Sequence, residues 1–177
     1  MTDSSAPLPT PPTHYNTPRY GLVALVALTT VLLDQLSKGW ILSTFTPGDI
    51  KPVISGLFNL TLTFNPGAAF GLWTGLSDGW RQLLLSLTVL IALAVVLFFL
   101  RQPTHRGRLS QIALAAILGG AIGNIVDRLR LGAVVDFIDI YLGSSHWPAF
   151  NIADSAICVG VSILILLPQS KTTPKNA

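Results

Sequence analysis

The stretch Ile112-Ala-Leu-Ala-Ala-Ile-Leu-Gly-Gly-Ala-Ile-Gly-Asn-Ile-Val-Asp-Arg-Leu-Arg-Leu131 decides the fold of this chain. Its first half is entirely apolar, and polar groups appear only toward its end, where Asn124, Asp127 and Arg128 lie three and four positions apart. An α-helix needs about 20 predominantly apolar residues to cross the hydrocarbon core of a bilayer. We therefore expect a membrane-spanning helix whose polar groups gather near one surface.

Three further apolar stretches accompany this one. They cover Tyr20 to Leu42, Leu83 to Leu100 and Ile152 to Leu167. Charged residues make up only 11% of the 177, against roughly 25% in a typical soluble domain. So few charged residues could not form the surface of a water-soluble protein. The chain is therefore predicted to be a mainly α, polytopic membrane protein with four transmembrane helices.

The two ends of the chain have a different composition from residues 20–168. Residues 1–19 are rich in proline, serine and threonine, and cannot bury enough apolar surface to offset the entropy of ordering. We expect a disordered tail there and a second short tail at 169–177. Lysine and arginine are more frequent at both ends and in the loop after the second helix than in the opposite loop, which predicts that both termini are cytoplasmic.

The first outer loop contains a strand signal. Asn59-Leu-Thr-Leu-Thr-Phe64 alternates polar and apolar residues, and Asn65-Pro66-Gly67 then favours a turn. This pattern predicts a small β platform in the first outer loop, resting on the membrane surface. The second outer loop, residues 132–150, shows no such alternation.

Several polar side chains of the predicted helices lie at the same depth. Asp34 and Lys38 are four residues apart on one face of the first helix, and a charged group inside a membrane costs at least ~2.5 kcal/mol, so each needs a partner or a task. We expect a structural ion pair. Gly119 and Gly123 form a G-x-x-x-G step, which lets helix backbones approach closely.

Two aspartates are harder to explain as structural groups. Asp136 lies in an apolar run of the second outer loop, and Asp154 lies in the first turn of the fourth helix, which Asn151 is placed to cap. If the loop folds back, the two carboxyls meet and share a proton, which is the chemistry of aspartic peptidases. The spacing alone leaves three alternatives open, namely structural pairing, peptidase chemistry and ion handling.

Composition excludes some other classes of protein. Cys158 is the only cysteine, which excludes an internal disulfide and a multi-cysteine metal site. The net charge of +3 comes from scattered residues without interleaved aromatics, which argues against a nucleic-acid partner. An ion carrier is disfavoured because the polar residues stop at one surface, and a purely structural adaptor leaves Asp136 and Asp154 unexplained.

Five segments of the chain together resemble one known family. They are Asp34-Gln-Leu-Ser-Lys38, Asn65-Pro-Gly-Ala-Ala-Phe70, Gly119-Gly-Ala-Ile-Gly-Asn-Ile-Val-Asp-Arg128, Val135-Asp-Phe137 and Phe150-Asn-Ile-Ala-Asp-Ser155. They occur in the order found in bacterial lipoprotein signal peptidases, and the resemblance spans about residues 20–168. It implies that this region is a four-helix membrane peptidase domain, with a small periplasmic β platform. Asp139, soon after Asp136, is a departure from the family pattern.

The resemblance implies an aspartic endopeptidase, signal peptidase II, of the bacterial inner membrane. It would cleave the signal peptide from diacylglyceryl-modified prolipoproteins, N-terminal to the lipidated cysteine, at the periplasmic surface, with no metal or cofactor. Its partners would be the lipidated substrates and membrane lipid. The implied catalytic dyad is Asp136 and Asp154. The implied substrate-binding or dyad-supporting residues are Asn65, Gly67, Asn124, Arg128 and Asn151. The implied structural positions are Asp34 and Lys38.

Overall fold

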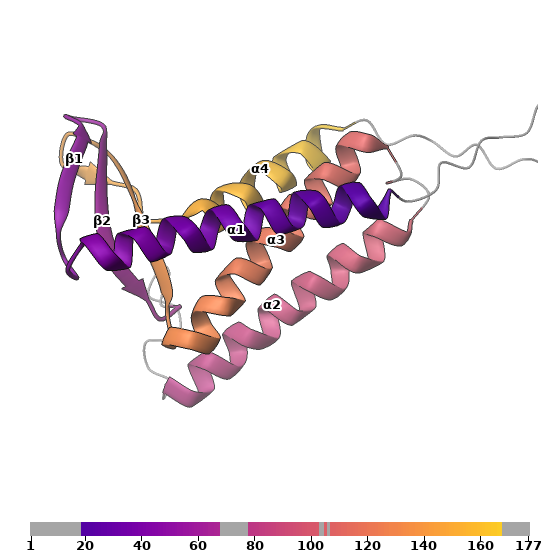
Figure 1. Cartoon of the computed structure of the whole chain (residues 1–177), viewed down its shortest axis with the longest axis horizontal. Helices are drawn as coiled ribbons and strands as arrows, with labels where there is room; N and C mark the ends of the chain where they lie inside the picture. The colour runs from indigo at the N-terminus through magenta and orange to yellow at the C-terminus, as the bar shows by residue number, and fades with distance from the viewer. Residues whose placement is uncertain (1–18, 68–77, 103–104, 106, 168–177) are drawn as a thin grey trace, which may run out of the picture.

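Helix α3 (Arg108–Leu131) is the central element of the computed structural model, which describes residues 19–67, 78–102, 105 and 107–167. It packs against α1 (Tyr20–Thr44), α2 (Asp78–Arg101) and α4 (Ile152–Leu166). An antiparallel sheet lies at one end of these helices (Figure 1). The expectation of a mainly helical protein with a small sheet is confirmed.

Glycines on α3 allow its neighbours to come close. A Cβ atom added at Gly119 would lie 2.6 Å from the carbonyl oxygen of Ala27 on α1, and one at Gly123 would lie 2.6 Å from Oδ2 of Asp34. On another side of α3, a Cβ at Gly120 would lie 2.5 Å from the carbonyl oxygen of Ala153 on α4. The G-x-x-x-G step thus brings α1 against α3, and the extra Gly120 does the same for α4.

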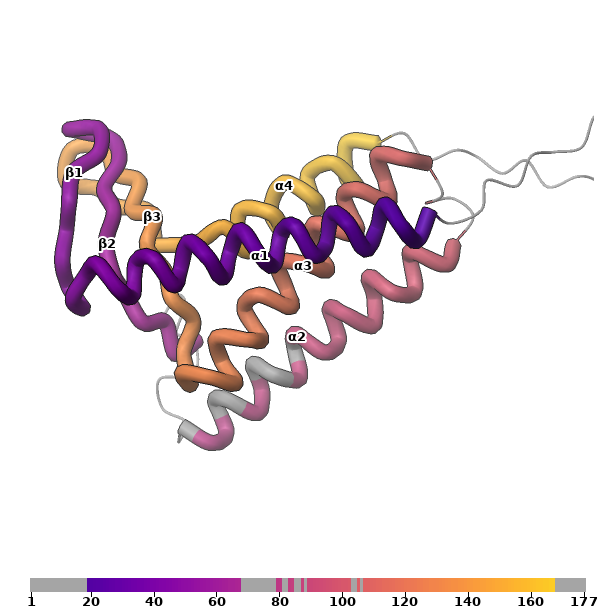
Figure 2. Tube along the Cα trace, viewed as in Figure 1, coloured from indigo at the N-terminus to yellow at the C-terminus, as the bar shows by residue number. Residues whose placement is uncertain are grey.

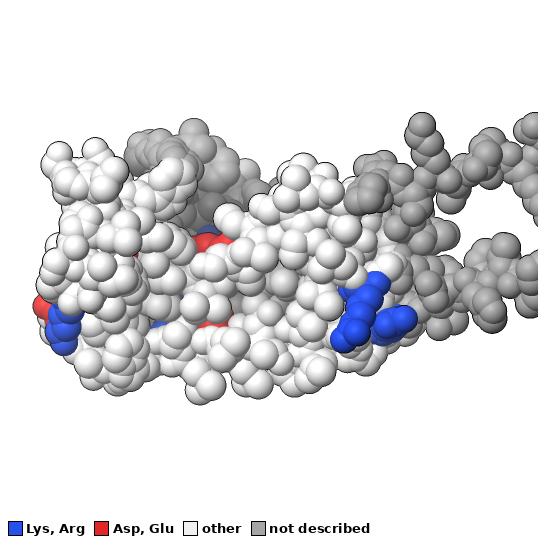
Figure 3. Space-filling view, turned by 90° about the horizontal axis from the view of Figure 1, so that it is seen from above, with Lys and Arg blue, Asp and Glu red and all other residues white. Residues whose placement is uncertain are grey.

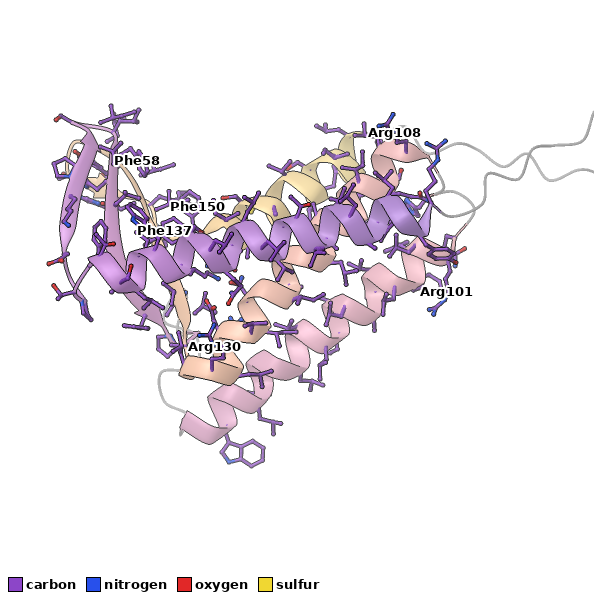
Figure 4. The ribbon with its side chains drawn as sticks, viewed as in Figure 1. Phe58, Arg101, Arg108, Arg130, Phe137 and Phe150 are labelled. Carbon is purple, nitrogen blue, oxygen red and sulfur yellow. The ribbon has the colours of Figure 1, made fainter. Side chains whose placement is uncertain are left out.

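The helices carry the surface expected of a membrane protein. By length and composition, α1 and α3 are long and apolar enough to cross a bilayer, while the described apolar stretch of α2, Val89–Arg101, and α4 are shorter. On the face in Figure 3 most of the surface along the helices is uncharged, and lysine and arginine atoms lie mainly at its two ends. Arg101 and Arg108 lie at the end away from the sheet (Figure 4).

The sheet is built from the segment that follows α1 and the segment between α3 and α4. Its strand order is β1 (Ile50–Ile54), β2 (Phe58–Asn65), β3 (Val134–Leu142) and β4 (Ser145–His146), all antiparallel. The tube in Figure 2 shows β3, which follows α3, returning beside β2. The predicted strand at 59–64 is therefore confirmed.

The prediction that placed the β platform in the first outer loop was incomplete. Strands β3 and β4 lie in residues 132–150, where the sequence showed no alternation. Residues Val134 to Phe137 of β3 are all buried, so the strand is covered on both faces and polar residues do not mark a solvent-facing side. A period of two residues is lost under such double burial.

An apolar cluster fixes β3 against the end of α1. Ile41 and Phe45 pack with Leu62 of β2 and with Val135 and Phe137 of β3. Because side chains alternate along a strand, this packing turns the residue between Val135 and Phe137 to the other face. That residue is Asp136.

The helix bounds differ from the predicted ones mainly at polar ends. Helix α2 begins at Asp78 rather than Leu83, and α3 begins at Arg108 rather than Ile112, because polar residues at a membrane surface can continue a helix beyond its apolar core. The predicted tails, residues 1–19 and 169–177, lie outside the described residues except for Arg19, which precedes α1.

The close approach of α1 and α3 gives a first prediction. Gly119→Ala adds a methyl group 2.6 Å from a backbone oxygen, so the helices must separate, and we expect the free energy of unfolding to fall by about 1–3 kcal/mol. Thermal unfolding in detergent measures this. The control is Gly39→Ala, also helical but with nothing within 4 Å, which should leave the melting temperature unchanged or raise it. Equal melting temperatures for the two variants would contradict the close contact.

Candidate functional site

Asp136 lies on β3 with only 2% of its surface exposed. Its Oδ1 accepts a hydrogen bond from Nδ2 of Asn151 at 2.7 Å, and its Oδ2 accepts one from Nδ2 of Asn65 at 2.9 Å. Both carboxyl oxygens therefore receive an amide N–H. Such bonds favour the ionised form of a carboxyl.

Asp154 lies in the first turn of α4, beside the side-chain amide of Asn151. Its Oδ1 accepts a hydrogen bond from Nδ2 of Asn124 at 2.7 Å. The N-cap of α4 is Asn151, whose Oδ1 accepts a hydrogen bond from the backbone N–H of Asp154 at 2.9 Å. Asn151 thus contacts the backbone of one aspartate and the carboxylate of the other, and so links Asp136 to Asp154.

The surroundings of Asp136 change its acidity. Burial raises the pKa of Asp136 to about 6, against the opposing effect of the Asn65 hydrogen bond and with a further increase from the negative charge of Asp154. The two aspartates, far apart in the sequence, are brought near each other by Asn151, which bonds to both. With its raised pKa, Asp136 can gain and lose a proton near neutral pH.

The Asn65 side chain is oriented by the turn that follows β2. The backbone N–H of Gly67 donates to Oδ1 of Asn65 at 2.9 Å, which leaves the Nδ2 group of Asn65 for Asp136. Gly67 has a φ of 90°, a left-handed conformation that glycine adopts without strain. The Asn-Pro-Gly turn is thus part of the site and not only a connection.

A buried ionic cluster lies behind the two aspartates. Nζ of Lys38 is 2.8 Å from Oδ2 of Asp34 and 2.8 Å from Oδ2 of Asp127, and no more than 3% of any of these side chains is exposed. The ion pair expected between Asp34 and Lys38 is present. Lys38 also donates to Oδ1 of Asn124 at 3.0 Å, which connects the cluster to Asp154.

Sequence analysis missed the role of Gln35. Its Nε2 donates to Asp127 at 2.9 Å, to Asp34 at 3.1 Å and to the carbonyl oxygen of Gly123 at 3.2 Å, so it joins α1 to α3. The available signal was its polar side chain within a predicted membrane helix. Arg128 directly follows Asp127 on α3. Its Nη1 donates to the carbonyl oxygen of Asn124 at 3.1 Å, and its positive charge interacts with Asp136 and Asp154.

Asp139 belongs to a separate group of side chains. It lies three residues after Asp136 and therefore on the opposite face of β3. Its Oδ2 accepts a hydrogen bond from Asn59 at 2.8 Å, and its Oδ1 lies 2.8 Å from Nδ1 of His146. Burial raises the pKa of Asp139, but the contacts with His146 and Asn59 outweigh that effect, so its pKa is lowered overall. The geometry therefore pairs Asp154 with Asp136 and not with Asp139.

Within the described ranges, no three His, Cys, Asp or Glu side chains are grouped so that they could hold a metal ion. In the part of the chain that the structure describes, the side chains that bond to Asp136 and Asp154 are the amides of Asn65, Asn151 and Asn124. Two carboxyls with oriented donors can supply an acid and a base, the two kinds of group that the hydrolysis of an amide uses.

The comparisons with known proteins agree with one another. A family model described as Signal peptidase (SPase) II matches residues 26–168. A lipoprotein signal peptidase of Syntrophus aciditrophicus is 45% identical over 155 residues, covering 88% of this chain and 96% of the relative. A lipoprotein signal peptidase of Desulforapulum autotrophicum is 41% identical over 143 residues, covering 81% of this chain and 88% of the relative.

A solved structure shares the fold. It is described as a bacterial membrane enzyme determined by the in meso method at 1.9 Å resolution, and it is 32% identical with a TM-score of 0.75, covering 87% of this chain and 96% of that chain. The fold is therefore that of a bacterial membrane enzyme. The chain belongs to the signal peptidase II family, and so to the proteases, and the resemblance found in its sequence is confirmed.

The double contact of Asn151 gives a second prediction. Asn151→Ala removes the cap of α4 and one donor to Asp136, so we expect the free energy of unfolding to fall by about 1–2 kcal/mol, as for other lost caps. Thermal unfolding in detergent measures the change. Ser162→Ala is the control, since it removes an exposed hydroxyl that bonds within α4 to the carbonyl oxygen of Cys158. An Asn151→Ala protein as stable as the control would show that the cap is not needed.

Proposed function

We propose that this chain is an intramembrane aspartic endopeptidase that cleaves the signal peptide from diacylglyceryl-modified prolipoproteins, N-terminal to the lipidated cysteine. Membership of the signal peptidase II family and relatives named lipoprotein signal peptidase support this reaction. The observation that carries the catalytic assignment is the placement of Asp136 and Asp154 on the two sides of Asn151.

The proposed topology has four transmembrane helices in the bacterial inner membrane. Both termini are cytoplasmic, residues 20–168 form the peptidase domain between two tails, and the active site faces the periplasm. Arg101 and Arg108 support this orientation because they lie at the end away from the sheet, and cytoplasmic loops retain arginine and lysine (Figure 4). The sheet and the two aspartates then lie at the outer surface, where a lipid-anchored cysteine would be held.

The proposed mechanism uses one ionised and one protonated carboxyl. We assign the ionised role to Asp136 because both of its oxygens accept amide N–H bonds, whereas the described residues contact only Oδ1 of Asp154 with a side chain. Asp136 takes a proton from the water as its oxygen attacks the scissile carbonyl. Protonated Asp154 stabilises the developing oxyanion and then gives its proton to the departing amine, and no metal or cofactor takes part.

Three neighbouring groups serve the substrate in this proposal. The Asn65–Gly67 turn at the end of β2 positions the lipidated segment against Asp136 while Asn65 holds the carboxyl itself. Arg128 binds a backbone carbonyl or a lipid ester oxygen, since its guanidinium is a fixed cation with several donors. Asn124 keeps Asp154 in place. The membrane lipid retains the acyl chains of the substrate.

The dyad assignment predicts the effect of removing either carboxyl. Asp136→Asn and Asp154→Asn should each lower kcat by about 10²–10⁴-fold, because each removes an acid or base from the reaction. The assay is cleavage of a diacylglyceryl-modified prolipoprotein by the purified full-length protein in lipid. Asp139→Asn is the matched control, since that carboxyl bonds to Asn59 and His146 and should leave kcat within a few fold. A folded dyad variant with normal turnover would refute the assignment.

The raised pKa of Asp136 predicts the pH dependence of cleavage. The base must be ionised, and burial holds its pKa at about 6, so kcat/KM should fall as the pH drops through about 6. An ordinary aspartate would lose its charge only near pH 4. The measured midpoint belongs to the coupled pair of carboxyls. A profile that stays flat down to pH 5 in folded protein would contradict the buried base, and Asp139→Asn should not move the midpoint.

A further inference from the structure

The amide of Asn124 has two possible orientations, and only one of them suits Asp154. Its oxygen only accepts hydrogen bonds, and its nitrogen only donates. The accepting oxygen of Asp154, Oδ1, needs the nitrogen, which is 2.7 Å away, and this bond leaves the proton of Asp154 on Oδ2. If the amide were rotated by half a turn, two oxygens would face each other. Some neighbour must therefore hold the Asn124 oxygen on the far side.

Lys38 is that neighbour. Its ammonium group can only donate, and it lies 3.0 Å from Oδ1 of Asn124. Nδ2 of Asn151 also donates to this oxygen, at the longer distance of 3.3 Å. Because a cation makes a stronger hydrogen bond than a neutral amide, Lys38 contributes most to the orientation. The Nδ2 group of Asn124 is then left for Asp154.

The position of Lys38 is itself fixed by groups that hold the backbone on both sides of the dyad. Asp34, which pairs with Lys38, also accepts a hydrogen bond from the backbone N–H of Ala153 at 2.9 Å. Asp127, its other partner, accepts one from the backbone N–H of Val135 at 3.1 Å. These two backbone groups directly precede Asp154 and Asp136, so a single cation is placed relative to both aspartates.

We propose that Lys38 is a positioning residue for the dyad, which fixes the side-chain amide of Asn124 so that its N–H group faces Asp154. The proposal rests on the proposed function of Asp136 and Asp154. It gives Lys38 a part in turnover that differs from the structural ion pair with Asp34. Lys38 acts through Asn124 and does not touch the substrate.

Removing the ammonium group should also change the proton affinity of the site. Among the described residues, the charged groups that interact with Lys38 are Asp34 on α1, Asp127 on α3, Asp136 on β3 and Asp154 on α4. Arg128 on α3 is a second cation that acts on Asp127, Asp136 and Asp154. Without Lys38, Arg128 is the remaining cation named here beside these four aspartates, so the net negative charge of the cluster increases. The dyad would then hold its protons to a higher pH.

The test compares Lys38→Met with Gln35→Met in the full-length protein, with the same prolipoprotein substrate. Gln35 is a matched control because it bonds to the same Asp34 and Asp127, and none of its hydrogen bonds goes to Asn124. We expect Lys38→Met to lower kcat by about 10²-fold with KM within a few fold. The midpoint at which kcat/KM falls on the acidic side of the pH profile should move up by about one pH unit. Gln35→Met should lower the melting temperature, but it should leave kcat within a few fold and the acidic midpoint of the pH profile unchanged.

A double-mutant cycle separates positioning from stability. If Lys38 acts through Asn124, the Lys38→Met/Asn124→Ala protein should lose no more activity than Asn124→Ala alone. The proposal would be overturned if the losses of activity in the two single variants multiply in the double variant. It would also be overturned if Lys38→Met has the same acidic midpoint as the wild-type protein. If Lys38→Met does not fold, the double variant Lys38→Met/Asp127→Asn removes the cation together with one anion. It is then compared with Asp127→Asn alone, and the same two results would overturn the proposal.

The outcome is distinguishable from failure of the proposed function. If Asp154→Asn keeps normal turnover, the dyad assignment fails, whatever Lys38→Met shows. If Asp154→Asn is inactive and folded Lys38→Met is as active as Gln35→Met, only the positioning role of Lys38 is overturned.

Discussion

The structure depends on one buried ammonium group that is shared by two carboxylates. Lys38, Asp34 and Asp127 have lost nearly all contact with solvent, and such a group of charges persists only if each is paired and the remaining lone pairs are satisfied. The chain meets this condition with backbone N–H groups of Val135 and Ala153. The bonds that satisfy the cluster therefore also hold β3 and the start of α4 in place, so the stability of the bundle and the positions of Asp136 and Asp154 have a common origin.

Much of the helical part of the structure could be predicted because its signals are local. A run of apolar residues indicates a spanning helix, the spacing of four between Asp34 and Lys38 places both on one face, and an asparagine before a helix indicates a cap. Each of these signals involves residues within one or two turns. The conformation that satisfies them is set largely by the segment itself, so the sequence is sufficient.

The sheet and the orientation of the site were less predictable because they depend on contacts between distant segments. Asn65 and Asp136 are 71 positions apart, and nothing near either residue indicates the other. Strand β3 is buried on both faces, so its composition resembles that of a helix core. The direction of each amide is also invisible in the sequence, because it is set by which neighbours donate and which accept. The family resemblance supplied the aspartates, but not these contacts.

The joining of β2 and β3 in one ladder has a consequence for motion at the site. Asn65 lies opposite Val134 in this ladder, so any tilting of the sheet carries Asn65 and Asp136 together as one rigid piece. Asp154 and Asn151 belong to the helices instead. A change in the gap between the carboxyls would therefore stretch the bond from Asn151 to Asp136 and spare the bond from Asn65, which makes the Asn151 amide the contact that reports any shift between β3 and α4.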